Sequence, residues 1–584
     1  MKLVQNLFLI LFPCCLALSA QKIQVPVIKD GLARVVPEFE DPGKWIRQDL
    51  WVETCFDSDG DGKMDRMHVD VTRPGQTEEG IRLPVVYISS PYFAGTGPVD
   101  DTYMWDVRHE LHTTPPVRRH IRPIEAENHR PVISNSHVEE WVPYGFIVVH
   151  SSAPGTGLSE GCPTVGGANE ALAPKAVIDW LNGRADGYTT PDGDQKVTAY
   201  WTTGKVGMTG TSYNGTIPLA AATTGVEGLE AIIPVAPNTS YYHYYRSNGL
   251  VRHPGGWLGE DIDYLYDWIF SGNRAKYDYC NYHIRDLEML ARHDRVSGDY
   301  NDFWAGRDYL NKLGPLKAAV FMAHAFNDWN VVPEHSYRII RELKKKGVPL
   351  KIYYHQGGHG GEPPFEMMNR WFTRFLFGVE NGAEEGPVAR IVREGDNRLD
   401  PTPYADYPNP DAEPVTLRMT PGATWSGGLV PAAREDISVP AARGEDIQVP
   451  GAPSPGESGI PSGEILPVTE TLVDNFSFSG EMLARAEWTG HRLMYLTPVL
   501  KDSLHISGPP SISIRLSSSK PSVNLSVWLV SLPWNDKKNA AITDNIITRG
   551  WADPQNHRSL TEGEPLVPGR FYEMTFDLQP DDQV

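Results

Sequence analysis

The strongest local signal for the fold is VGMTGTSYNG, at residues 206–215. Its apolar beginning, 206–208, is typical of a buried strand, and the residues after Ser212 favour a helix. The stretch therefore predicts a strand that turns sharply at Ser212 and continues as a helix. Gly210 and Gly215 fit such a turn, because its cramped backbone tolerates only small neighbours.

This turn exposes the serine hydroxyl and aims the next backbone N–H at a developing oxyanion, so Ser212 is a candidate nucleophile. The second glycine follows the serine by three residues rather than two, so the pattern G-x-S-x-G is met only approximately. A Gly/Ser-rich turn without catalysis is the alternative interpretation.

Outward from this stretch, short apolar strands alternate with helical stretches between about residues 45 and 380. This alternation is typical of an α/β fold with a mostly parallel sheet covered by helices. We expect strands at 83–89, 145–150, 205–208, 231–235, 318–324 and 351–355, and helices at 168–181, 216–223 and 333–346.

Two further groups stand at the ends of later strands. Asp328 follows the strand predicted at 318–324, and His359 follows the strand at 351–355, in the loop QGGHGG. The order Ser, Asp, His is that of the α/β-hydrolases, in which histidine takes the serine proton and the carboxylate orients the imidazole. Taken singly, Asp328 could cap a helix and His359 could be a solvated loop residue. His324 and His355 are expected to be hydrogen-bonded core histidines.

Residues 45–237 and 316–380 form the predicted hydrolase domain. The neighbouring regions have other sequence patterns. Residues 238–315 interrupt the alternation and are rich in Tyr, Trp, Asp and Arg, which indicates an inserted helical cap. Beyond 385 the helical period disappears, and alternating runs at 511–516 and 523–529 predict a C-terminal β-sandwich over 385–584. A duplicated decapeptide at 435–450, within a Pro/Gly-rich stretch at 430–463, predicts a surface loop or linker.

Composition narrows the class of protein. Lys and Arg number 53 against 74 Asp and Glu, and the net charge of −21 argues against a nucleic acid partner. Residues 1–20 resemble a secretory signal, so we expect a secreted or periplasmic protein, and no later stretch predicts a membrane span. Cleavage would leave Cys55, Cys162 and Cys280, which allow at most one internal disulfide. Assembly into a homo-oligomer stays open.

Several motifs together resemble the Xaa-Pro dipeptidyl-peptidases, relatives of cocaine esterase and the amino-ester hydrolases. They are SYNGT at 212–216, PGTGLSEG at 154–161, NDWNV at 327–331 and GH at 358–359. The resemblance extends from about residue 45 to the C-terminus and includes a sandwich similar to the family's jelly roll around 495–498. The stretch YYHYYRSNG at 241–249, with DWN at 328–330, favours the dipeptidyl-peptidase branch over the esterases. The chain stops at 581–584, where the family continues with further strands, so we expect a truncated C-terminal domain.

The resemblance implies a serine exopeptidase that releases N-terminal Xaa-Pro dipeptides from proline-containing peptides through an acyl-enzyme, without a required cofactor. It also implies an oxyanion hole made by the Tyr92 hydroxyl and the Tyr213 N–H. A free substrate amine needs a carboxylate, for which Glu260 is our choice over Asp261 and Asp263. The other expected substrate-binding residues are Tyr241, Tyr244, Trp329 and Asn330.

Two alternatives remain at this stage. The chain could be an esterase or acylase acting on amino-acid esters or β-lactam-type amides. It could also be an inactive carbohydrate- or peptide-binding protein that keeps the sandwich.

One acidic segment stands apart from the triad. The segment DSDGDGKMD, residues 57–65, has carboxylates at alternating positions and glycine at its sixth position, as the first half of a calcium loop does. The Glu expected at position twelve is absent. A tight Asp/Gly hairpin between two strands is therefore the alternative to a structural calcium site. The candidate ligands are Asp57, Asp59, Asp61 and Asp65.

Overall fold

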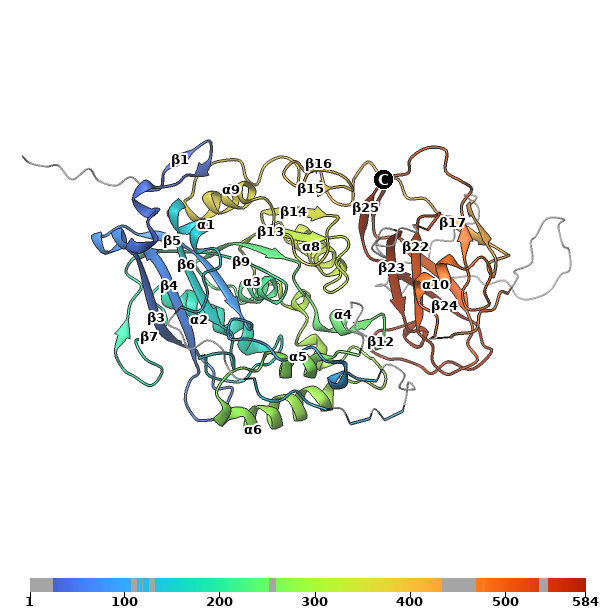
Figure 1. Ribbon diagram of the computed structural model, residues 1–584, viewed down its shortest axis with the longest axis horizontal. Helices are drawn as coiled ribbons and strands as arrows, with labels where there is room; N and C mark the ends of the chain where they lie inside the picture. Colours follow the sequence, from blue (N-terminus) through green and yellow to red (C-terminus); the bar gives the residue numbers. More distant parts are fainter. Residues whose placement is uncertain are drawn as a thin grey trace, which may run out of the picture.

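The computed structural model describes residues 25–106, 113–114, 116–117, 119–124, 132–251, 259–432, 469–475, 477–534 and 545–584. The predicted signal at 1–20 and the duplicated decapeptide at 435–450 lie outside the described residues. A hydrolase domain and a domain of C-terminal strands lie side by side (Figure 1). Within the described ranges, no helix has the length and apolar character needed to cross a bilayer.

The hydrolase domain is built on one large sheet. In the described part of the chain, twelve strands take the order β16-β15-β14-β13-β10-β9-β5-β6-β4-β3-β7-β8. The central neighbours from β15 to β6 pair in parallel, whereas β4 and β3 pair antiparallel. The strands are β3 Trp45–Glu53, β4 Arg66–Pro74, β5 Leu83–Ser90, β6 Ile147–Ser152, β7 Gly187–Tyr188, β8 Lys196–Val197, β9 Thr202–Thr211, β10 Leu229–Val235, β13 Ala319–Ala325, β14 Leu350–His355, β15 Ala389–Val392 and β16 Thr402–Tyr404. All six strands predicted from the sequence are confirmed.

The sheet extends beyond the boundary that the sequence pattern suggests. We expected the hydrolase domain to end near 380 and the sandwich to begin at 385. Instead, β15 pairs with β14 and β16 pairs with β15, so the sheet continues to Tyr404. These strands have four and three residues, too few for a hydrophobic period to distinguish them from a loop.

Helices cover both faces of the sheet, because neighbouring residues of each central strand point to opposite sides. Val85 and Tyr87 of β5 face the core that includes α2, α3 and α8, whereas Val86 and Ile88 face the core that includes α1 and α9. The predicted helices at 168–181, 216–223 and 333–346 are confirmed. The helices are α1 Val138–Trp141, α2 Ala168–Leu181, α3 Tyr213–Thr223, α8 Glu334–Lys346 and α9 Phe365–Leu376.

The segment between β10 and β13 forms short helices and one small hairpin along the lower side of Figure 1. A disulfide between Cys162 and Cys280 joins this cap to the loop that follows β6. Its elements are α4 Tyr241–Tyr245, β11 Arg246–Ser247, β12 Leu250–Val251, α5 Ile262–Ile269, α6 Tyr277–Cys280, a π-helix at Asn281–Leu290 and α7 Asp302–Ala305.

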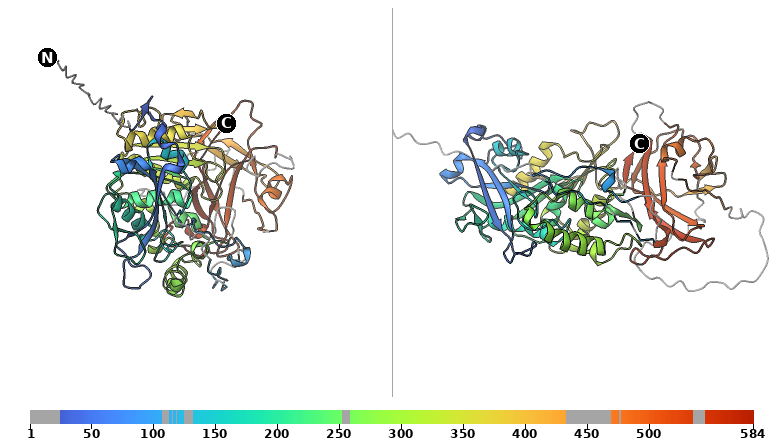
Figure 2. Two further views of the ribbon diagram at one scale, coloured as in Figure 1. Left: turned by 60° about the vertical axis from the view of Figure 1, so that its left-hand side comes forward. Right: turned by 60° about the horizontal axis from the view of Figure 1, so that its bottom comes forward.

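The C-terminal domain consists mostly of strands, which lie at the end of the molecule opposite the N-terminal strands in the right-hand view of Figure 2. The runs expected at 511–516 and 523–529 form β21 and β22. The last strand, β25, lies on the side that faces the hydrolase domain (Figure 1). The elements are β17 Leu417–Thr420, β18 Gly427–Pro431, α10 Gly480–Arg485, β19 Tyr495–Leu496, β20 Ile506–Gly508, β21 Ser511–Leu516, β22 Leu525–Val530, β23 Ile546–Ala552, β24 Tyr572–Asp577 and β25 Asp581–Gln583.

Candidate active site

Ser212 stands at the turn between β9 and α3, with φ 66° and ψ −127°. A non-glycine residue with positive φ is strained and persists only where its surroundings hold it. Here the Ser212 N–H donates to the Val235 carbonyl at 2.9 Å, and a Cβ at Gly215 would lie 2.5 Å from that same oxygen. The Ser212 side chain makes no capping hydrogen bond to the helix. The turn thus presents its hydroxyl to a pocket rather than to its own helix.

The Asp328 and His359 side chains meet above the carboxyl ends of β13 and β14. Asp328 is fully buried, and its Oδ2 lies 2.7 Å from His359 Nδ1. Its Oδ1 accepts the backbone N–H groups of Asn330 and Val331, both at 3.0 Å. Burial raises the pKa of Asp328, but hydrogen bonds from His324 and His359 outweigh it and bring the value to about 2. The group is therefore a carboxylate at neutral pH.

The two other histidines of this region are buried, as the sequence predicted. His324 lies between the Val331 carbonyl and the Ser336 hydroxyl, with its Nε2 also 3.5 Å from Asp328. His355 Nδ1 accepts the Gly357 N–H, and its Nε2 donates to the Gly360 carbonyl. Burial lowers the pKa of His355 to about 4, so this ring is neutral and shapes the loop that carries His359.

Tyr92 follows β5 and packs edge-on against the rings of Tyr213 and Trp268. Burial, with the charges of Glu260 and Glu170 adding to it, raises the pKa of Tyr92 well above its usual value. Its hydroxyl therefore stays protonated and available as a donor. Tyr213 is the first residue of α3, so its backbone N–H has no partner within the helix.

Glu170 is a residue of this region that sequence reasoning missed. It lies at the start of α2, and its carboxylate accepts the N–H groups of Thr164, Val165 and Gly166 together with the Tyr213 hydroxyl. Val165 has φ 48°, a strained value for a β-branched residue. Burial raises the pKa of Glu170, whereas these donors favour its charged form. Only the fold brings the acid to Tyr213, 43 residues away.

Ser212 and His359 line one small cavity of about 200 Å³ together with Tyr92 and Tyr213. Its walls include eight of the residues that the sequence predicted as nucleophile, base, oxyanion donors or substrate contacts. Val99, Asn238, Tyr264, Leu265, Trp268 and Val331 complete the wall without having been predicted. Asp328 lies behind His359 and outside the lining. The predicted residues that line the cavity are Tyr92, Ser212, Tyr213, Tyr241, Tyr244, Glu260, Asn330 and His359.

The three acidic candidates of the cap differ in their surroundings. Glu260 lines the cavity and accepts a hydrogen bond from the Tyr245 hydroxyl at 3.4 Å. Asp261 instead caps α5 and pairs with Arg246 at 3.1 Å and Arg295 at 2.7 Å. Asp263 is fully buried and does not line the cavity. Of the three, Glu260 alone reaches the cavity in the described part of the chain.

Tyr244 and Asn330 join across the cavity wall, because the Tyr244 hydroxyl donates to Asn330 Oδ1 at 2.8 Å. Trp329 has a different place. It packs edge-on against Trp551 of β23 and under the Arg549 guanidinium, and it does not line the cavity. The structure therefore brings Trp329 to the C-terminal domain rather than to the expected substrate position.

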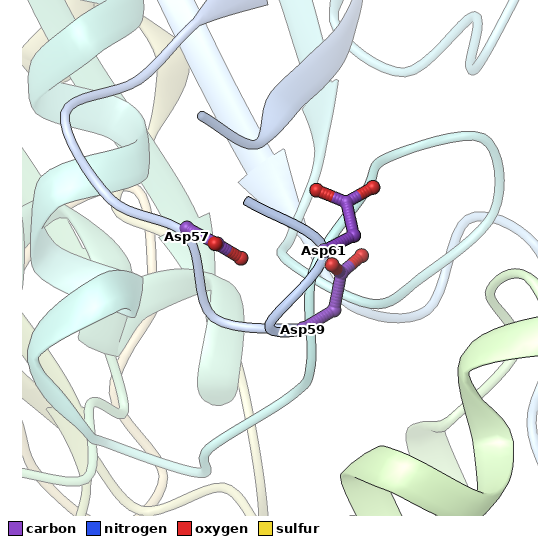
Figure 3. Close-up of side chains that lie close together, drawn as sticks. All are labelled: Asp57, Asp59 and Asp61. Carbon is purple, nitrogen blue, oxygen red and sulfur yellow. The ribbon is translucent and has the colours of Figure 1, made fainter. Parts of the chain in front are cut away.

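The acidic segment 57–65 joins β3 to β4, and Figure 3 shows three of its side chains: Asp57, Asp59 and Asp61. One carboxylate oxygen from each lies within 4.8 Å of the other two. The Lys276 ammonium lies 2.8 Å from Asp59 and 2.9 Å from Asp61. The Lys276 hydrogen bond lowers the pKa of Asp61. Asp65 is outside this group, since its Oδ2 accepts the Ser58 N–H and hydroxyl. Burial raises the Asp65 pKa to about 7.

Family models and sequence relatives match nearly the whole chain. The family model of X-Pro dipeptidyl-peptidase (S15 family) matches residues 59–361, and that of the X-Pro dipeptidyl-peptidase C-terminal non-catalytic domain matches residues 453–584. A putative Xaa-Pro dipeptidyl-peptidase of Rhodopirellula baltica is 61% identical, over 98% of this chain and 87% of the relative. One of Bacillus anthracis is 36% identical, over 95% and 83%.

Solved structures show the same fold at low identity. A CocE/NonD family hydrolase from Staphylococcus aureus matches 92% of this chain and 86% of its own, with a TM-score of 0.52 and 14% identity. The sequence relatives and the two family models identify the family as well as the fold. The chain belongs to the X-Pro dipeptidyl-peptidase (S15) family.

Proposed function

We propose that this chain releases N-terminal Xaa-Pro dipeptides from peptides, with Ser212 as nucleophile, His359 as general base and Asp328 as the acid that orients it. The observation that carries the proposal is that Ser212, His359, Tyr92 and Glu260 line the same cavity. It joins a nucleophile and base to an oxyanion donor and an amine-binding carboxylate, which are the groups that a dipeptidyl-peptidase needs.

The chemistry follows from the hydrogen bonds of His359. Its Nδ1–H donates to Asp328, which leaves Nε2 as the acceptor for the Ser212 proton. The Ser212 oxygen attacks the carbonyl carbon of the proline residue, and the resulting oxyanion accepts hydrogen bonds from the Tyr92 hydroxyl and the Tyr213 N–H. His359 then returns the proton to the leaving amine. Water repeats the cycle to release the dipeptide from the acyl-enzyme.

Specificity comes from the cavity wall. The rings of Tyr241, Tyr244 and Trp268 give an aromatic surface for the proline ring, which has no N–H to satisfy. Among the described residues that line the cavity, Glu260 is the acidic one. It is therefore the partner for a substrate ammonium. A site that holds both ends of the dipeptide measures two residues from the free amino terminus.

The test compares Gly-Pro-anilide with its N-acetylated form. We expect cleavage of the free substrate and no turnover of the acetylated one. Glu260→Gln should cost the free substrate on the order of 2–5 kcal/mol, mainly as a raised KM, because the ammonium loses its buried partner. Equal rates for both substrates would contradict recognition of the free amino terminus. Faster hydrolysis of simple amino-acid esters would then favour an esterase or acylase.

For the acidic loop, we propose that Lys276 supplies the cation and that no calcium is needed. The ammonium lies between Asp59 and Asp61, and Asp57 accepts the Gly60 and Gly62 N–H groups. The melting temperature should not change with chelator or added calcium. In Lys276→Met, where the carboxylates lose their cation, calcium should raise it. A chelator-induced drop in the unmodified protein would restore the calcium interpretation.

Export is also proposed. The signal-like residues 1–20 support it, and so does the Cys162–Cys280 disulfide, because disulfides persist in oxidising compartments. The measurement is the N-terminal sequence of protein recovered from the periplasm or medium. A mature chain that begins beyond residue 20 agrees with the proposal, and an intact Met1 in a cytoplasmic fraction contradicts it.

A further inference from the structure

The loops that carry Asp328 and His359 contact the C-terminal domain directly. Three residues before His359, the Gln356 amide donates to Asp581 Oδ1 at 3.2 Å and to the Asp582 carbonyl at 2.7 Å. Its own carbonyl and side-chain oxygens accept the Asn327 amide at 3.0 and 3.1 Å. One side chain thus connects strand β25 to both catalytic loops.

A second contact holds the loop after β13. The Arg549 guanidinium carbon lies 3.9 Å from the Trp329 ring centre, and the Trp329 and Trp551 rings meet edge-on with centres 6.5 Å apart. Arg549 and Trp551 are alternate residues of β23 and so share one face of that strand. Trp329 lies within the turn whose N–H groups Asp328 accepts, so fixing the indole fixes the direction of the carboxylate.

Strand β25 is itself firmly placed. The buried Asp582 carboxylate accepts hydrogen bonds from Tyr404, His505 and Ser507, at 2.9, 2.9 and 2.6 Å. The Tyr407 hydroxyl donates to the Asp581 carbonyl at 2.9 Å. These partners lie in or next to β16, at the edge of the hydrolase sheet, and in or next to β20. Gln356 therefore bonds to a strand that is itself held on two sides.

We infer that the C-terminal domain is a positioning element of the active site: Arg549 and Trp551 hold Trp329, and Asp581 and Asp582 hold Gln356, so that Asp328 and His359 keep their alignment. The inference rests on the proposed catalytic roles of Asp328 and His359. None of the four positioning residues lines the cavity, so they act through the loops and not on the substrate. Misalignment of a catalytic group by about 1 Å can cost up to 100-fold in rate.

The experiment measures kcat and KM for Gly-Pro-anilide, the rate of Ser212 labelling by a fluorophosphonate, and the melting temperature. Gln356→Ala and Arg549→Gln should each lower kcat and the labelling rate about tenfold, with KM and the melting temperature nearly unchanged. Gln579→Ala is the matched control. It removes the hydrogen bonds between Gln579, which precedes β25, and Glu334 at the start of α8. These bonds belong to the same interface but lie outside the turn that Asp328 caps and outside the loop of His359. We expect this control to keep the full labelling rate.

The outcomes separate the two proposals. Unchanged labelling in both loop-contact variants would overturn the positioning role while leaving the triad intact. An equal loss in Gln579→Ala would also overturn it, because general weakening of the interface would then explain the effect. If the unmodified protein is not labelled, or Ser212→Ala is labelled equally, the triad itself fails and the positioning role falls with it.

Discussion

The nucleophile and the acid–base pair are held in two different ways. Ser212 sits in a strained turn whose hydrogen-bond partners, Val235, Gly215 and Thr216, belong to neighbouring elements of one βαβ unit. Asp328 and His359 lie on loops that depend on side chains of β23 and β25, more than 200 residues away along the chain. A turn that stores strain needs dense local packing, whereas two loops at the edge of a sheet can be aligned by a second domain.

The largest expected effect tests whether the two sides act as one unit. Ser212→Ala, Asp328→Asn and His359→Ala should each lower kcat by about 10⁴ or more, because removing any member disables the proton transfer. The check is kcat on Gly-Pro-anilide, with circular dichroism to show that each variant is folded. Full activity in a folded Ser212→Ala protein would end the serine mechanism.

A smaller effect is expected from a residue that acts near Ser212 and not on the acid–base pair. Tyr92→Phe should lower kcat by roughly 100-fold with little change in KM, since an oxyanion donor acts mainly in the transition state. Steady-state kinetics separate the two constants. A change confined to KM would assign the Tyr92 hydroxyl to substrate binding instead.

Variants of Glu170 test whether its hydrogen bond to Tyr213 helps to position the residues next to Ser212. Glu170→Gln replaces one acceptor oxygen of a buried carboxylate by an amide, so Tyr213 loses part of its anchor and kcat should fall about tenfold. Tyr213→Phe removes the same hydrogen bond from the other side. The double variant should lose little more than either single one, as residues of one contact do not act additively. Additive losses would show that Glu170 acts elsewhere.

The last effect concerns the pH dependence of stability rather than the rate, and it involves the loop that carries His359. The pKa of His355 falls from 6.5 to about 4 in the folded protein, so its stabilising contribution is complete above pH 6.5 and disappears as pH falls through 4. The full contribution is on the order of 3 kcal/mol. Melting temperatures between pH 4 and 7 should fall on acidification, and His355→Gln should flatten this part of the curve. An identical slope in the variant would exclude His355 as its source.

Those parts of this protein whose signals are local could be predicted from sequence patterns. Gly210, Ser212 and Gly215 predict the strained turn because steric limits act between near neighbours. Asp328 and His359 could be predicted because each directly follows a recognisable buried strand, and parallel strands deliver their ends to one edge of the sheet.

The distant side chains that support those groups could be identified only in the folded protein. Glu170 reaches Tyr213, Lys276 reaches Asp59, and Trp329 meets Trp551 instead of the cavity. No spacing rule connects such partners, since a long-range contact depends on how complete elements pack and not on the intervening sequence. A local pattern specifies backbone geometry, whereas the partner of a buried carboxylate or indole is whichever group the assembled fold places within a few ångströms of it.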